Sequence, residues 1–176
     1  MKRSVFTWQI LGFIFTGVLG TLLHFLFDWT DGSLGAALIS AVNESIWEHM
    51  KLIFVPMVVF SLIQRKCFPE LPGFWWVKLT GILTALVLIP AVYYTYTGAL
   101  GIRADWFNIA IFFIAAAAAF RLETALFRRG KACPLPERLA VVLIAAIGAV
   151  FLLFTFLPPA LPLFRDPRDG SFGFRG

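Results

Sequence analysis

Residues 43–63 read NESIWEHMKLIFVPMVVFSLI and place a group of ionisable side chains at the start of a long apolar run. Glu44, Glu48, His49 and Lys51 fall within two helical turns, and no charged residue follows before residue 64. A run of this kind favours a helix that lies in a membrane. Ionisable groups at the edge of such a helix are costly to bury, which makes them candidates for function.

The composition extends this interpretation to the whole chain. Of the 176 residues, 60% are hydrophobic and 14% are charged, and the mean hydropathy is +0.84. A soluble domain carries about 25% charged residues, so a soluble protein is disfavoured. Residues 1–176 suit one transmembrane domain. The net charge of +5 is shared between the two membrane faces. It is therefore not evidence of a nucleic-acid partner, and we expect none.

Five apolar segments predict an all-α integral membrane bundle. Each segment approaches the ~20 residues that cross ~30 Å of hydrocarbon as a helix. They lie at residues 5–27, 46–63, 74–96, 106–127 and 139–157. The expected partner is therefore the lipid bilayer, and a homo-oligomer is compatible with so small a bundle.

The distribution of basic residues predicts the orientation. One face carries Lys2, Arg3, Arg65, Lys66, Lys78, Arg128, Arg129, Lys131 and Arg138, whereas the other carries Arg103, Arg165, Arg168 and Arg175. Cytoplasmic loops are enriched in Lys and Arg. We therefore expect the N-terminus inside and the C-terminus outside, in a multi-pass membrane protein.

Three connecting segments carry further expectations. Residues 32–42 are apolar but short, so they are interpreted as a re-entrant or interfacial segment, or as an extension of the second helix. Asn43 is expected to cap the second helix, with Glu44 in its first turn. Residues 158–176 are rich in Pro and Gly with spaced Phe, and they are interpreted as a lid. Cys67 and Cys133 are expected in inner loops without a disulfide.

Polar side chains from four helices are expected to meet at the outer end of the bundle. His24 lies on a stripe of small residues that faces other helices, and Asp28 follows it by one turn. The second helix runs inward from the same end. The remaining polar candidates at this level are Asn43, Ser45, Lys51, Tyr93, Tyr96 and Asn108.

These residues leave several interpretations open. Histidine and carboxylate side chains suit a divalent metal such as zinc, manganese or iron, with His24, Asp28, Glu48 and His49 as ligands and Glu44 as a general base. The same groups also suit a proton relay or cation path, a salt-bridged structural network, or a haem held by the two histidines. Tyr93, Tyr96 and the nearby Trp residues equally suit an interfacial aromatic belt.

Three stretches carry a resemblance to a known family: HFLFDW at 24–29, VNESIWEHMKLIFVP at 42–56 and PPALPLFRDPRDGSFG at 158–173. Together they resemble a family of small, uncharacterised multi-pass bacterial membrane proteins with an NESxWEH motif, and this resemblance implies a location in the bacterial inner membrane. The element from His24 to Asp28 is also similar to the first metal-site motif of alkaline-ceramidase-type membrane hydrolases. This chain departs from that pattern in having five predicted spans and no late His-x-x-x-His pair.

The leading hypothesis is a metal-dependent hydrolase that acts on a lipid or an amide at the outer membrane face. The alternatives are a carrier or channel component that binds a proton or cation, and a non-enzymatic accessory membrane protein. An enzyme requires a closed set of metal ligands, whereas a carrier requires polar groups that continue to the inner face.

Overall fold

The computed structural model describes residues 2–99, 101, 105–130 and 135–174. Its long helices are α1 (Lys2–Trp29), α3 (Ile46–Cys67), α4 (Phe74–Tyr94), α5 (Asp105–Arg129) and α6 (Glu137–Phe156). The shorter elements are α2 (Leu34–Ala37), the π-helical turn η1 (Thr95–Ala99) and the 3-10 turn η2 (Pro162–Phe164). The described residues form no β-strand, and their one isolated bridge joins Arg165 to Phe172.

The predicted all-α class is confirmed, and all five long helices are long and apolar enough to cross a membrane. Each predicted segment coincides with one of them, and the ends differ by at most four residues. The largest difference is at the end of α3, which continues to Cys67. This cysteine is therefore exposed on the last helical turn and not in a loop, whereas Cys133 lies outside the described residues.

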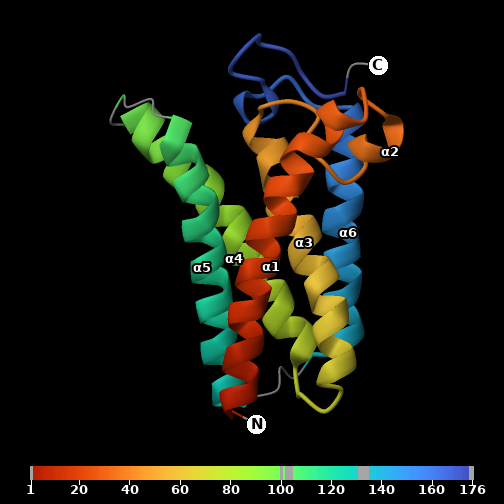
Figure 1. Cartoon of the computed structure of the whole chain (residues 1–176), viewed down its shortest axis with the longest axis vertical. Coiled ribbons are helices and arrows are strands. Elements are labelled where there is room, and N and C mark those ends of the chain that lie inside the picture. The colour runs from red at the N-terminus through yellow and green to blue at the C-terminus, as the bar shows by residue number, and fades with distance from the viewer. Residues whose placement is uncertain (1, 100, 102–104, 131–134, 175–176) are drawn as a thin grey trace.

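The helices run side by side along the long axis of the molecule (Figure 1). α1 packs against α3 and α5, and α4 packs against α3, α5 and α6. We call the lower end in Figure 1 the N-terminal end, and the upper end, where α2 and the last residues lie, the tail end. The tail segment, residues 158–174, folds over α1, α3 and α6 at the tail end, whereas the upper parts of α4 and α5 lean away from it (Figure 1).

Close contact between α1 and its neighbours depends on small residues. A Cβ atom on Gly20 would lie 2.6 Å from Cζ of Phe112 and 2.8 Å from the carbonyl oxygen of Leu52, so only glycine fits there. One turn earlier, Thr16 is fully buried. The small-residue face of α1 therefore packs against α3 and α5, as the sequence predicts, and His24 continues this face toward the tail end.

A buried ion pair lies near the N-terminal end. Lys78 Nζ is 2.5 Å from Glu123 Oε2, and both side chains are at most 1% exposed. The rings of Phe60, Phe74, Phe120 and Phe127 surround the ammonium group, with centroids 5.5–5.8 Å away. The charge pattern of the sequence placed Lys78 among the basic residues of one membrane face, and the structure corrects this: α4 begins at Phe74, so Lys78 lies inside the helix and faces the core.

We predict that Lys78→Met strongly destabilises the protein, because it leaves the Glu123 carboxylate buried without its counter-charge. The expected loss is about 3–5 kcal/mol of unfolding free energy. The double variant Lys78→Met/Glu123→Leu should recover most of it, because apolar residues replace both charges. Thermal unfolding of the detergent-purified variants measures both effects. Equal stability of Lys78→Met and the wild type would contradict a buried charged pair.

Candidate metal centre

The start of α3 is set by a short hydrogen-bonded turn. Ser45 Oγ accepts a hydrogen bond of 3.3 Å from the Glu48 backbone N–H, and Asn43 Oδ1 accepts one of 2.9 Å from the Ser45 N–H. The N-cap is therefore Ser45, whereas the sequence predicted Asn43. Because the cap lies two residues later than predicted, Glu44 lies before the helix, and Glu48 occupies its first turn.

This start brings three potential metal ligands together at the tail end. His24 of α1, Glu44 and His49 each offer one ligand atom, and these atoms all lie within 4.8 Å of one another. The imidazole ring centroids of the two histidines are 5.3 Å apart, and Glu44 Oε2 is 3.6 Å from His49 Nε2. All three residues are half-buried, so the group lies at the surface of the bundle.

The tautomer of His49 follows from its backbone neighbour. His49 Nδ1 lies 3.0 Å from the carbonyl oxygen of Ser45, which can only accept a hydrogen bond. Nδ1 therefore carries the ring hydrogen in the neutral imidazole, and the lone pair of Nε2 faces the Glu44 carboxylate. Two acceptors that face each other in this way are held together by a proton or a metal cation between them.

The tail segment holds Glu44 from the other side. Arg168 Nη1 lies 3.4 Å from Glu44 Oε1, and Asp166 Oδ2 accepts a hydrogen bond of 2.9 Å from the Glu44 N–H. Asn43 Nδ2 donates to the carbonyl oxygen of Gly173 at 3.2 Å. The segment from 158 to 174 is thus a folded cover over this end of the bundle, and its function as a lid stays a prediction.

Glu48 belongs to a different, fully buried network. Its Oε2 lies 2.7 Å from Lys51 Nζ and accepts a hydrogen bond from the Val42 N–H at 3.2 Å. Its Oε1 accepts a hydrogen bond of 2.8 Å from Thr155 Oγ1 on α6. Lys51 Nζ also donates to Thr155 Oγ1 and to the carbonyl oxygen of Ala37. Both carboxylate oxygens of Glu48 are therefore occupied by protein donors.

The structure places the two glutamates in different surroundings from those that their predicted roles require. Glu44, the predicted general base, lies among the potential ligands, whereas Glu48, a predicted ligand, pairs with Lys51. Asp28 is exposed and is not among the potential ligands in the described part of the chain.

The remaining polar candidates do not join this group. Tyr96 of η1 donates a hydrogen bond from its hydroxyl to Asn108 Oδ1 of α5, and Tyr93 packs edge-on against the Tyr96 ring. These residues lie at the upper ends of α4 and α5, which lean away from the tail segment (Figure 1). The predicted convergence therefore holds for α1 and α3 but not for α4 and α5.

Of the basic residues used to predict orientation, Arg103, Lys131 and Arg175 lie outside the described residues.

A family model for a family of unknown function matches residues 1–174. The chain belongs to this family, DUF6512. No curated protein matches the chain, and no solved structure does. The comparisons therefore agree with the expected uncharacterised family, and the functional argument depends on the geometry of the site.

We predict that Glu48→Gln destabilises the fold, since it leaves the Lys51 ammonium group buried without its counter-charge. The loss should approach the about 3–5 kcal/mol that is typical when one partner of a buried ion pair is removed. Glu44→Gln is the matched control, because its partly exposed ion pairs contribute about 1 kcal/mol at most. Thermal unfolding compares the two, and a larger loss for Glu44→Gln would contradict this assignment.

Proposed function

We propose that this chain is a multi-pass membrane protein with a divalent metal centre formed by His24, Glu44 and His49. Five apolar helices support the membrane placement. The observation that carries the metal assignment is the pair of facing acceptors, His49 Nε2 and Glu44 Oε2, with a His24 ring nitrogen within 4.8 Å. A cation between these two atoms would offset the repulsion between the lone pair of His49 Nε2 and the Glu44 carboxylate.

The donor set favours zinc or a similar transition metal. Two imidazole nitrogens and one carboxylate oxygen are typical of catalytic zinc sites, which use three protein ligands and leave a fourth position open. The outer contacts also fit, because ligand histidines usually donate their second ring N–H to a carbonyl or carboxylate. Here the Ser45 carbonyl fixes His49, and Arg168 holds the second oxygen of Glu44.

The proposed chemistry is hydrolysis of a lipid or an amide at the tail end, which we place at the outer membrane face. A divalent metal in this position supplies an activated water. Arg168, which is mostly exposed beside the centre, is placed to hold an anionic group or a developing negative charge on the substrate. Phe25 stacks on His24 with a centroid distance of 5.1 Å and is itself exposed, so the centre borders an apolar surface.

A proton or cation carrier is the weaker proposal. The two buried ion pairs, Glu48–Lys51 and Lys78–Glu123, lie toward opposite ends of the bundle. Between them the core face of α3 is formed by Ile53, Phe54, Met57 and Phe60. This apolar layer interrupts a continuous polar path, whereas a one-sided metal centre needs no such path.

The metal assignment is tested by elemental analysis of the detergent-purified protein. We expect about one equivalent of a transition metal per chain in the wild type, in line with a three-ligand site, and its loss in His24→Ala and His49→Ala. Asp28→Asn is the matched control and should retain the metal, because Asp28 lies outside the cluster. Hydrolysis is then measured on lipid esters and amides with metal-loaded and chelated protein.

Two results would contradict the metal assignment. One is a folded wild type that takes up no transition metal on titration. The other is equal metal content in all four proteins, which would indicate adventitious binding elsewhere on the chain.

The membrane orientation is tested separately by cysteine labelling in intact cells. In a Cys67→Ser/Cys133→Ser background, Leu161→Cys in the exposed tail segment should react with a membrane-impermeant maleimide. In a second protein that carries only Cys133→Ser, the native Cys67, at the opposite end of the bundle, should react only after the cells are opened. The reverse pattern would show the opposite orientation and place the metal centre in the cytoplasm.

A further inference from the structure

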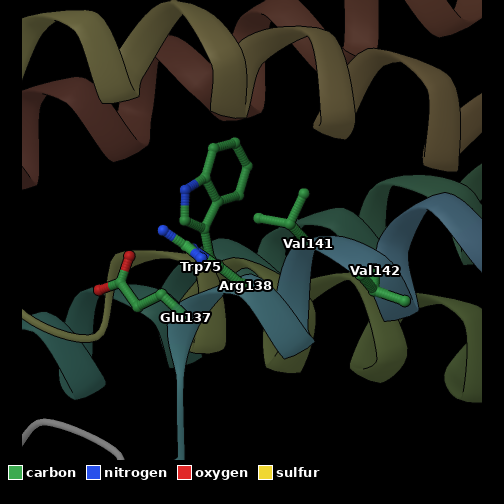
Figure 2. A pocket seen from close by; sticks show the side chains of 5 residues that line it. All are labelled: Trp75, Glu137, Arg138, Val141 and Val142. Carbon is green, nitrogen blue, oxygen red and sulfur yellow. The ribbon is translucent and has the colours of Figure 1, made fainter.

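A groove lies along α6, on the side of the bundle away from the metal centre. α6 packs mainly on α4 and makes fewer contacts with α3, which leaves two adjoining cavities of about 330 and 260 Å³. Trp75 of α4 and Val141 of α6 line both cavities, so the two adjoin, and we treat them together as one groove. Figure 2 shows the first of them, where the Trp75 indole stands beside α6.

The walls of the groove are apolar over the depth of one lipid leaflet. Phe54, Val58 and Leu62 of α3 face Val141, Ala145 and Gly148 of α6. From Arg138 to Gly148, α6 rises about 15 Å at 1.5 Å per residue. This is half of the ~30 Å hydrocarbon core of a bilayer, so the groove matches one acyl chain that enters from the N-terminal end.

The mouth of the groove carries an available positive charge. Glu137 is already engaged, because its Oε1 accepts a hydrogen bond of 3.0 Å from the Phe74 N–H and its Oε2 lies 3.9 Å from Arg65 Nη2. Arg138 is exposed and forms no ion pair or hydrogen bond within the described residues. Glu137 and Arg138 lie at one end of the cavity, and Val141 and Val142 lie toward the other (Figure 2).

We propose that this groove binds an anionic phospholipid of the leaflet at the N-terminal end. One acyl chain lies between α3 and α6, and the phosphate group contacts the Arg138 guanidinium. The proposal rests on the membrane placement proposed above, but it is independent of the metal centre.

The test is native mass spectrometry of the protein released from nanodiscs that hold equimolar phosphatidylglycerol and phosphatidylethanolamine with the same acyl chains. We expect the wild type to retain phosphatidylglycerol about fivefold in excess, the effect of one basic group near the membrane surface. Arg138→Gln should retain the two lipids equally. Arg121→Gln, which removes an exposed arginine from α5, is the matched control and should keep the preference.

A second pair of variants tests the groove itself. Ala145→Phe fills it and should reduce the number of bound lipids, whereas Leu143→Phe, at an exposed position on the opposite face of α6, should not. Equal retention of the two lipids by the wild type would overturn the proposal. So would a wild-type dimer that Ala145→Phe converts to a monomer without changing the lipid preference, because a second chain would then occupy the groove.

The same samples separate the two proposals. Metal content, measured on each preparation, should be equal in Arg138→Gln, Ala145→Phe and the wild type. Failure to insert into nanodiscs at all would contradict the membrane placement and the lipid groove together, whereas a loss of lipid preference alone would leave the metal centre unaffected.

Discussion

The carboxylate of Glu48 is the constraint on which the tail end of the molecule depends. A buried charge is tolerated only when its counter-charge and its hydrogen-bond donors are all in place. Lys51, Thr155 and the Val42 N–H meet this demand from three parts of the chain, and Lys51 also holds the Ala37 carbonyl. α3, α6 and the segment after α2 are thereby fixed relative to one another. The positions of Glu44 and His49, which flank Glu48 in sequence, follow from this arrangement.

The sequence predicted the helices well because their signal is local. A run of about 20 apolar residues identifies a helix without reference to any other part of the chain, and the spacing along α1 predicted that His24 lies on the face toward other helices. The difference in the surroundings of the two glutamates arises at the helix start: Glu44 and Glu48 share a face only if both are helical, and the Ser45 cap leaves Glu44 outside the helix. The contacts of Glu44 with Asp166 and Arg168 join residues more than a hundred positions apart, and no local pattern specifies such pairs.

The two buried ion pairs and the proposed metal centre illustrate how the environment decides what a carboxylate does. Glu48 and Glu123 are fully buried, and each has a lysine within 2.7 Å. In the Glu48 pair, Lys51, Thr155 and the Val42 N–H occupy both carboxylate oxygens, so this glutamate leaves no coordination position open. Glu44 is 24% exposed and shares its oxygens between Arg168 and a neutral imidazole. A metal ion could approach this carboxylate without first breaking a buried salt bridge. This is why Glu44, and not Glu48 or Glu123, is proposed as the carboxylate ligand.

The proposed metal site would be largely formed before any metal binds. The Ser45 carbonyl orients His49, packing on α3 and α5 places α1 and thus His24, and the tail segment holds Glu44. In small zinc domains the free energy of metal binding is spent on folding the chain. Here the helices and the Glu48 network supply the fold, so the binding free energy is available for the metal itself. The choice among metal ions would then depend on the type and geometry of the ligands. Two imidazoles with one carboxylate favour zinc-like ions over magnesium or calcium.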